Sequence, residues 1–409
     1  MKHLPRTLEP TVKQVSSQFP VLLLTGPRQV GKSTLLADCA EPGRASVTLD
    51  DIEQRALAEA DPALFLQMHP PPVIIDEVQY APQLFSVIKI IVDEEKRPGM
   101  FWLTGSQKFH LMQGVSETLA GRVAILDLLG LSQAEINHHA HLTQPFLPTD
   151  SWLATVKKGK KLPLSCMEMY RRIWCGAFPR MVLGDLSLRD VFFRSYVQTY
   201  IERDVRALAK VGDEMAFARF LRVVAARTAQ LVNYADMARD VDVDQKTIKS
   251  WLSILETSGL IYLLQPWHGS VTKRMVKTPK LYFLDTGLCA WLTQWSTPET
   301  LESGAMSGAI FETWVFAEIL KSWWHAGRTP SFYFYRDRDQ KEIDLLIEQD
   351  GLLYPVEFKK SASPSMNAAN HFVILEQLKQ SVGPGAVICL KEMAVPLSRQ
   401  VMAVPAAYL

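Results

Sequence analysis

A glycine-rich segment that directly follows an apolar run constrains the fold of this chain most strongly. Residues 21–24 are all aliphatic, and residues 26–33 read GPRQVGKS. The second segment fits the pattern G-x-x-x-x-G-K-[ST] at every fixed position. In this pattern a buried strand delivers a loop whose backbone N–H groups point at phosphate oxygens, and a helix carries the chain away. The sequence therefore predicts a strand, a phosphate-binding loop and a helix near the N-terminus.

The side chains of this loop predict how it holds a nucleotide. Lys32 is expected to reach the β- and γ-phosphates, and Ser33 is expected to ligate Mg²⁺. A helix that starts near Lys32 adds the positive end of its dipole. We therefore expect ATP and Mg²⁺ as cofactors. The residues expected to bind the nucleotide in this segment are Gly26, Pro27, Arg28, Gln29, Val30, Gly31, Lys32, Ser33 and Thr34.

Polar residues at the ends of two later strands complete the predicted nucleotide site. The apolar run 73–75 leads into Asp76 and Glu77, as at the ligand edge of an open parallel sheet. We expect Asp76 to hold Mg²⁺ through water and Glu77 to polarise the attacking water. One strand later, residues 101–104 lead to Ser106, which we expect to sense the γ-phosphate. The sequence thus predicts an ATPase.

Arg122 has two interpretations. It follows Gly121, which ends a helical pattern soon after the strand that precedes Ser106. Arg122 is therefore a candidate arginine finger or γ-phosphate sensor. It equally fits a residue that caps the helix or pairs with a surface acid, and the sequence leaves both interpretations open.

The spacing of the strands predicts the architecture of residues 1–140. Strand patterns alternate with helical patterns, which is typical of an α/β fold with helices on both faces of a parallel sheet. We therefore predict that residues 1–140 form a P-loop domain of the AAA+ type, preceded by an amphipathic helix. The strands are expected near residues 21–25, 45–49, 73–76, 101–104 and 123–128.

Length and charge bound the remaining possibilities. A chain of 409 residues with 48% apolar content forms two or three globular domains. The net charge is +1, so any affinity for DNA has to come from local patches. The start lacks a signal core, and no apolar run approaches the roughly 20 residues that span a bilayer. We therefore expect a cytoplasmic protein without a membrane segment.

Residues 141–215 are predicted to form a linker and a helical region. The segment 140–165 carries prolines, threonines and the lysine-rich run 157–161, and we expect an exposed linker there. These lysines fit either a contact with a phosphate backbone or a solvated loop. Residues 166–183 and 189–210 have helical periodicity.

Residues 216–285 resemble a winged helix in outline. Three short helices are followed by strands at 260–264 and 281–285 that enclose a basic hairpin. Lys246, Thr247 and Lys249 begin the third helix and are candidates for DNA contacts, with the hairpin lysines on phosphates. Such regions also serve as protein-packing modules, and this alternative stays open.

The last region, residues 286–409, contains a second group of residues whose side chains are suited to catalysis. Glu357 and Lys359 lie two apart on a predicted strand and so share a face, and Asp344 on the neighbouring strand can converge on them. Two carboxylates and an ammonium group are suited to hydrolysing a phosphodiester with metal-bound water, with Asp344 and Glu357 as metal ligands. Glu312 on a preceding helix is a further candidate ligand. The alternative is an ion pair on a solvated sheet face.

Several motifs together resemble the predicted bacterial and archaeal AAA+ ATPases that carry a C-terminal DUF4143 domain. The C-terminal Asp344 and Glu357-x-Lys359 are similar to the core of the PD-(D/E)xK nucleases, which gives a restriction-endonuclease-like α/β domain. In place of the two glycines usual in the family, this chain has Gly176-Ala177 before Phe178-Pro179. The segments that carry the resemblance are 26–33, Ile75-Asp76-Glu77-Val78-Gln79, Leu103-Thr104-Gly105-Ser106, Leu119-Ala120-Gly121-Arg122, 176–179, 200–205 and Val356-Glu357-Phe358-Lys359.

The resemblance implies ATP binding and hydrolysis, with Lys32, Ser33, Asp76 and Glu77 matching the family position by position. It also implies a homo-oligomer in which Arg122 or Arg203 reaches the γ-phosphate of a neighbour. Our hypothesis is that the nucleotide state controls the winged-helix and nuclease-like modules on DNA. The alternative is a nucleotide-dependent switch that recruits a protein partner and whose nuclease-like domain is catalytically inactive.

Overall fold

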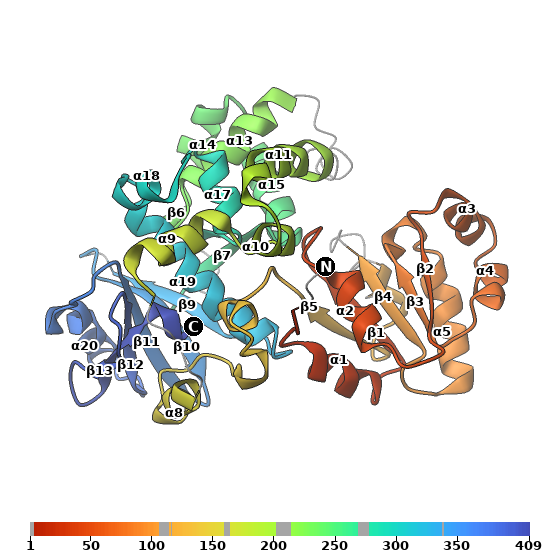
Figure 1. The fold of residues 1–409 in the computed structure, drawn as a ribbon, viewed down its shortest axis with the longest axis horizontal. Helices are drawn as coiled ribbons and strands as arrows, with labels where there is room; N and C mark the ends of the chain where they lie inside the picture. The colour runs from red at the N-terminus through yellow and green to blue at the C-terminus, as the bar shows by residue number, and fades with distance from the viewer. Residues whose placement is uncertain are drawn as a thin grey trace.

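Two β-sheets organise the chain, one in each half (Figure 1). The computed structural model describes residues 4–105, 114–115, 117–158, 164–201, 214–268, 278–337 and 339–409. The red-to-orange N-terminal domain lies on one side of the molecule in this view, and the blue C-terminal strands lie on the other. Green and teal helices lie above and between them.

The first sheet is parallel throughout and has the strand order β2-β3-β4-β1-β5. The predicted α/β fold and its strand positions are confirmed, with each boundary within one residue of the expected one. All five residues of β1 are buried, as expected of a central parallel strand. The elements are β1 (Val21–Thr25), β2 (Ala45–Thr48), β3 (Val73–Asp76), β4 (Phe101–Gly105) and β5 (Val123–Asp127), with helices α1 (Glu9–Ser16), α2 (Lys32–Cys39), α3 (Ile52–Ala60), α4 (Pro62–Met68) and α5 (Leu84–Glu95).

The two faces of the first sheet belong to different cores, because successive side chains of a strand point to opposite faces. Val21 and Leu23 pack with the cluster beneath α4 and α5. Leu22 and Leu24 belong to a cluster that also contains α1 and α2 and continues into the helices and strands of the second half. One side of the N-terminal domain is therefore joined to the rest of the molecule by continuous apolar packing.

The region between the sheets differs from the prediction in two places. The expected exposed linker contains the helix α8 (Asp150–Lys158), whose Trp152 and Leu153 are buried. The helix expected over 166–183 is split into α9 (Cys166–Cys175) and α10 (Pro179–Leu183). The helix ends at Gly176, whose φ of 80° favours glycine. A larger residue does not fit there, because a Cβ would lie 2.6 Å from Asp285 Oδ1. Periodicity alone shows neither the break nor the burial.

The second predicted helix of this region is described only in part. It begins as α11 (Arg189–Tyr196) and continues as a π-helical turn, Val197–Ile201. Residues 202–213, which include Arg203, lie outside the described residues, as do residues 159–161 of the lysine run.

A three-helix unit and a small antiparallel sheet follow, as expected for residues 216–285. β8 (Lys280–Phe283) pairs with β6 (Gln230–Leu231) on one side and β7 (Ile261–Pro266) on the other. β7 also pairs with β9 (Phe332–Arg336), so this small sheet continues into the C-terminal one. Of the basic hairpin expected between the strands, with Lys273, Arg274, Lys277 and Lys280, residues 269–277 lie outside the described part of the chain. The helices are α13 (Glu214–Ala226), α14 (Tyr234–Val241) and α15 (Gln245–Thr257).

The combined second sheet has the order β13-β14-β12-β11-β10-β9-β7-β8-β6. The long helix α19 (Ser307–Trp324) packs against β8 and β11 of this sheet, and most of its side chains are buried. Among the described residues, no helix is both long and apolar enough to cross a bilayer. Apart from short 3-10 helices, the remaining elements are α7 (Gln133–Ile136), α17 (Thr286–Leu292), α18 (Pro298–Ser303), β10 (Glu342–Gln349), β11 (Leu352–Lys359), α20 (Val373–Gln377), β12 (Gly385–Cys389), β13 (Val395–Pro396) and β14 (Val401–Pro405).

Candidate nucleotide site and carboxylate centre

The backbone of residues 26–31 forms a tight loop between β1 and α2. Gly26 has a φ of 145° and Gly31 a φ of 95°, both in the region that favours glycine. A Cβ on Gly26 would lie 2.0 Å from Leu128 O, so only glycine fits there. Gly31 is the N-cap of α2, so the loop leads directly into a helix N-terminus. This is the strand, loop and helix arrangement that the motif predicts.

Lys32 and Ser33 occupy positions suited to a nucleotide and its metal. Lys32 is buried, and its Nζ donates to Gly26 O at 3.0 Å and Pro27 O at 2.9 Å. Ser33 is exposed, and its Oγ lies 2.9 Å from both carboxylate oxygens of Asp76. A cation held inside the loop fits phosphates, and a hydroxyl beside a carboxylate supplies the hard oxygen ligands that Mg²⁺ prefers. The donor set therefore fits ATP with Mg²⁺.

Thr104 connects the two acidic residues at the carboxyl edge of the sheet. Its hydroxyl donates to Asp76 Oδ1 and accepts from the backbone N–H of Glu77 at 3.3 Å. Glu77 has a positive φ of 56°, and its carboxylate accepts a hydrogen bond from Gln79 Nε2. The structure thus brings Ser33, Asp76 and Glu77 to one edge, as predicted. Ser106 lies outside the described residues.

Arg122 lies at the opposite edge of the sheet from the loop. It immediately precedes β5, whose first residue pairs with Val21 at the start of β1, whereas the loop follows the end of β1. Its guanidinium forms a two-pronged ion pair with Asp93, at 2.5 and 2.9 Å. A strand of five residues separates the two edges by roughly 15 Å. The expectation that Arg122 binds the nucleotide of its own chain is therefore corrected, and pairing with a surface acid is the interpretation that the geometry favours.

Arg6, which belongs to no recognisable sequence motif, lies beside the phosphate-binding loop. Its Nη1 donates to Val30 O at 2.9 Å, and its Nη2 donates to Leu129 O at 2.8 Å. Its Nε lies 3.1 Å from Glu135 Oε1. The side chain is 6% exposed. One buried arginine therefore joins the loop to the segment that follows β5.

Glu135 connects this arginine to the C-terminal half. Its Oε1 also accepts from Thr7 N at 2.8 Å and lies 3.3 Å from Nδ1 of His325, the C-cap of α19. Leu129 N donates to His325 Nε2 at 3.2 Å, which places the imidazole proton on Nδ1, facing Glu135. Burial opposes the charge of Glu135, yet Arg6 and His325 hold the pKa of this carboxyl well below its usual range. Burial lowers the pKa of His325, although Glu135 opposes that shift.

The lowered pKa of His325 predicts a pH-dependent contribution to stability. In the unfolded chain His325 takes up a proton below its ordinary pKa of 6.5, while the folded chain resists protonation. The stabilising contribution is therefore present above pH 6.5 and is lost as pH falls toward the lowered folded pKa. We expect the unfolding free energy of the wild type, minus that of His325→Gln, to fall by up to about 1.4 kcal/mol per pH unit below 6.5. Chemical denaturation between pH 5 and 8 measures this difference, and a flat difference would contradict it.

Two further side chains of α19 hold the same segment. Glu318 Oε2 accepts from Gln133 N at 2.8 Å, and Lys321 Nζ donates to Leu131 O at 3.0 Å. Lys321 and Glu318 also pair with each other at 2.6 Å, and both are buried. Residues 128–135 and the C-terminal end of α19 therefore form one polar, buried contact, which we call the α19 junction.

The loop and the segment that follows β5 also approach residues between the two sheets. A Cβ on Gly259, just after α15, would lie 3.0 Å from Pro27 Cδ. Ala177 O accepts from Leu131 N at 2.7 Å, and Ala177 N donates to Asp285 Oδ2 at 2.8 Å. The loop thus lies close to the end of α15, and the segment that follows β5 is bonded to the region between the two sheets.

The structure brings the predicted acidic residues of the C-terminal domain together. Glu357 Oε1 pairs with Lys359 Nζ at 2.6 Å, and Asp344 Oδ2 accepts from Phe358 N at 2.9 Å on the same strand, β11. Glu312 of α19 accepts from Tyr282 Oη at 2.8 Å. Asp344 and Glu357 are both buried, so a solvated sheet face is excluded. We call Glu312, Glu342, Asp344 and Glu357 the carboxylate centre.

Lys280 of β8 lies inside this centre, although its sequence surroundings predict only a residue of a basic hairpin. Its Nζ lies 2.6 Å from Glu312 Oε1, 2.7 Å from Glu342 Oε1 and 3.4 Å from Asp344 Oδ1. Burial and the charge of Asp344 raise the pKa of Glu312 to about 7. The same two causes, opposed by Lys359, raise the pKa of Glu357 to about 8. Crowding of buried carboxylates is the shared reason.

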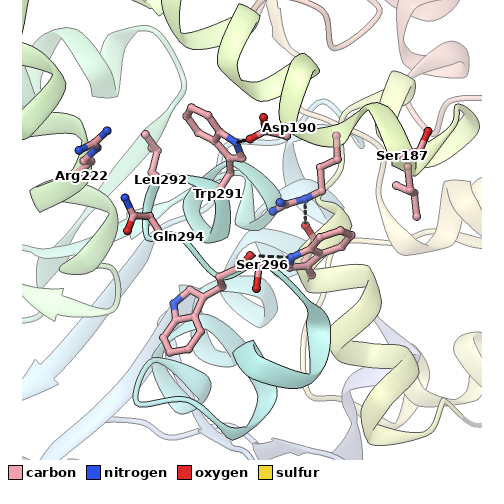
Figure 2. Close-up of a pocket in the computed structure, with 11 residues that line it drawn as sticks. Ser187, Asp190, Arg222, Trp291, Leu292, Gln294 and Ser296 are labelled. Atoms are coloured by element: carbon pink, nitrogen blue, oxygen red, sulfur yellow. Dashed lines mark hydrogen bonds between the residues drawn. The ribbon is translucent and has the colours of Figure 1, made fainter.

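A pocket of about 470 Å³ opens among α9, α11 and α17, away from both sites (Figure 2). Trp174, Trp291 and Trp295 contribute its aromatic lining. Trp291 Nε1 donates to Asp190 Oδ1 at 2.8 Å, and Trp174 Nε1 donates to Trp295 O at 2.9 Å. In Figure 2, Arg222 and Gln294 lie together on one side of the pocket.

The candidate DNA-contacting residues lie at the start of α15. Lys246 and Lys249 are exposed, and Thr247 N donates to the N-cap residue Asp244. Lys249 Nζ lies 5.1 Å from the ring centroid of Tyr234. The lysines therefore face solvent, with an aspartate beside them.

Comparisons with known proteins place the chain in a family. Residues 18–137 match an AAA domain, residues 167–299 match a domain of unknown function, DUF8612, and residues 307–409 match another, DUF4143. An uncharacterized protein of Mycobacterium tuberculosis is 30% identical over 401 residues, which cover 97% of this chain and 82% of the relative. An uncharacterized protein of Mycobacterium bovis matches to the same extent.

The fold and the loop thus define a P-loop ATPase of the AAA class. The chain belongs to the family of AAA-domain proteins that carry a C-terminal DUF4143 domain.

Similar solved structures include a Walker-type ATPase of Pyrococcus abyssi, 14% identical, with a TM-score of 0.45, over 69% of this chain and 94% of that one. The RuvB Holliday junction branch migration motor of Thermotoga maritima is 13% identical, with a TM-score of 0.31, over 64% of this chain and 90% of that one.

Proposed function

We propose that this chain is an ATP-hydrolysing switch whose nucleotide state repositions its winged-helix-like region and C-terminal domain, with DNA as the target. The observation that carries the proposal is the buried connection from Val30 through Arg6 and Glu135 to His325. A change in the backbone of the loop displaces a carbonyl that Arg6 holds, and Arg6 contacts the α19 junction directly. Breaking a buried charged network of this kind is costly, so we infer that a displacement of the loop moves the network as a unit.

The residues of the loop supply the ATPase chemistry. ATP with Mg²⁺, when bound, supplies the phosphoryl group that water attacks. Lys32 turns its ammonium from the loop carbonyls toward the phosphates, while Ser33 and Asp76 hold the metal. Glu77 orients the attacking water and accepts its proton on a carboxylate oxygen. The hydroxyl of Thr104 bonds both Asp76 and the backbone N–H of Glu77, and so fixes the two acidic residues relative to each other.

The helix α19 is the element that carries the change onward. Glu312 and His325 are 13 residues apart on one helix, which separates the carboxylate centre from the α19 junction by about 20 Å. A rigid helix moves as a unit, so a shift at His325 also shifts Glu312. The contact between Gly259 and Pro27 provides a second, shorter route from the loop to α15.

The role of Arg6 is tested by a substitution that keeps its charge. Arg6→Lys retains a cation beside Glu135 but cannot bond Val30 O and Leu129 O together, because lysine lacks the planar fork. We expect it to cost about 1–3 kcal/mol of unfolding free energy, measured by denaturant titration. We also expect ATP binding to persist while its effect on the C-terminal half is lost. Arg55→Lys, which alters an arginine with a 28% exposed side chain in the same domain, is the matched control.

DNA binding is tested by fluorescence anisotropy with a labelled duplex and the full chain, in ATP and in ADP, over a range of salt concentrations. We expect affinity to differ between nucleotides and to fall as salt rises. If both lysines contact phosphates, Lys246→Ala/Lys249→Ala should reduce the slope of log affinity against log salt concentration by about two. Lys13→Ala/Lys379→Ala should leave this slope unchanged. Equal, salt-independent signals in both nucleotides would overturn the proposed DNA target.

The second candidate is a switch that recruits a protein partner. The pocket in Figure 2 favours it, because tryptophan and arginine side chains dominate protein interaction sites. Conformational response to ATP without any DNA affinity is the outcome expected from this candidate.

Assembly into a homo-oligomer is part of the proposal. Arg122 lies at the edge of the sheet away from its own loop and pairs with Asp93, so any role in nucleotide binding would have to be at a neighbour's site and would require this pair to open. Sedimentation velocity with and without a slowly hydrolysed ATP analogue tests this arrangement: a larger species with the analogue supports it, and a constant monomer contradicts it.

A further inference from the structure

We propose that Lys280 is the resident cation of the carboxylate centre and occupies carboxylate oxygens that a divalent metal ion would need there. The centre therefore serves as a structural joint between the winged-helix-like region and the C-terminal domain, and not as a nuclease site. This inference concerns a different site from the nucleotide loop and does not depend on ATP turnover.

The geometry matches an ammonium group. Lys280 Nζ carries three N–H donors, and it lies within 3.4 Å of three carboxylates from different elements: Glu312 on α19, and Glu342 and Asp344 on β10. Lys280 is 4% exposed. A buried lysine is stable only when its charge is paired, and this one is paired three times.

The same geometry does not suit a divalent metal ion. Mg²⁺ and Ca²⁺ need several oxygens at about 2.0–2.6 Å. Lys280 Nζ already contacts one carboxylate oxygen each of Glu312, Glu342 and Asp344. Two cations that share these carboxylates would repel each other strongly in a buried site. Among the described residues, no three His, Cys, Asp or Glu side chains are arranged to hold a metal ion. The residues present therefore do not fit the metal that the nuclease resemblance implies.

Most other groups of the centre also have partners, although Glu357 Oε2 is buried without a hydrogen bond to any described residue. Glu357 Oε1 pairs with Lys359, and Asp344 Oδ2 accepts a backbone N–H of β11. Arg336 pairs with Glu342 at 3.0 Å. Four carboxylates thus face three cationic side chains of the protein itself, which balances most of the charge without an ion from solution.

The position of Lys280 in the chain gives this pairing a structural consequence. β8 belongs to the small sheet of the winged-helix-like region, whereas α19 and β10 belong to the C-terminal domain. Lys280 therefore ties the two regions together at the point where the sheets merge through β7 and β9.

Mn²⁺ binding followed by electron paramagnetic resonance tests the inference on the nucleotide-free full chain. All proteins carry Asp76→Asn, which removes the metal ligand of the nucleotide loop. With Lys280 present, we expect Asp344→Asn to leave the number of bound Mn²⁺ ions unchanged. With Lys280→Met, we expect one additional Mn²⁺ per chain, and we expect Asp344→Asn to remove it again.

Two results would overturn the inference. The first is a Mn²⁺ ion that binds with Lys280 in place and is lost in Asp344→Asn. The second is a folded Lys280→Met protein, verified by circular dichroism, that gains no Mn²⁺. If Lys280→Met does not fold, the inference is tested by the effect of Asp344→Asn on Mn²⁺ binding in proteins that keep Lys280. If the wild-type chain does not hydrolyse ATP, the proposed function is refuted, but the Mn²⁺ binding result is unaffected.

Discussion

Lys32→Ala is expected to abolish ATP binding by the intact chain. The loop surrounds the ammonium group of Lys32, which donates hydrogen bonds to Gly26 O and Pro27 O. Charge-assisted contacts to phosphate contribute about 1.5–3 kcal/mol each, so losing contacts to two phosphates weakens binding by roughly 10²-fold or more. Titration of a fluorescent ATP analogue measures the change directly.

The control for this variant is Lys13→Ala, which removes an exposed lysine of α1 in the same domain. It should bind the analogue as the wild type does. Circular dichroism should show that both variants are folded, so that any loss of binding comes from the missing ammonium group. Retention of wild-type affinity in folded Lys32→Ala would show that ATP does not bind at this loop.

Glu77→Gln is expected to separate binding from turnover. Glutamine keeps the size of the side chain and its bond to Gln79, but it cannot accept the proton of water. Removing a general base costs about 10²- to 10⁴-fold in rate, whereas ATP binding should change little because Glu77 is not one of the loop residues. Steady-state phosphate release and analogue titration together measure both effects.

Glu59→Gln on the exposed face of α3 is the matched substitution, and it should hydrolyse ATP at the wild-type rate. A Glu77→Gln protein that hydrolyses ATP at the rate of this control would remove Glu77 from the mechanism. A protein that loses binding as well would show that Glu77 acts on the nucleotide and not on water.

Much of the nucleotide site is predictable because its parts are local. The loop is a contiguous motif, and Asp76 and Glu77 follow an apolar run that can only be a buried strand of the same sheet. Parallel strands bring their carboxyl ends to one edge, so sequence order translates directly into proximity. Asp344 and Glu357 were placed together by the same kind of argument, the two-residue period of neighbouring strands.

The residues that connect the sites are not predictable in this way. Arg6, Glu135 and His325 are separated by more than 120 positions at each step, and none of them belongs to a motif. Their meeting depends on how two domains dock, which no local pattern encodes. Arg122 shows the converse: it is close in sequence to the predicted sensor strand, but the chain has already crossed to the far edge of the sheet.

Lys280 illustrates a further limit. Its sequence surroundings are basic, and this composition suggested a solvated hairpin on DNA. The structure instead buries its ammonium among three acids from other elements. Composition records the charge of a residue, but burial and partners decide whether that charge serves a ligand or the fold.

Hydrogen exchange of the full-length Glu77→Gln protein, compared between ATP and ADP, tests the central claim most directly. The account predicts different amide exchange in two regions far from the nucleotide, residues 128–137 and 318–325, in addition to the loop itself, and it predicts that Arg6→Lys abolishes the distant difference. A nucleotide effect confined to residues 26–34 and 76–80, with the α19 junction unchanged, would contradict the claim that this ATPase is a switch.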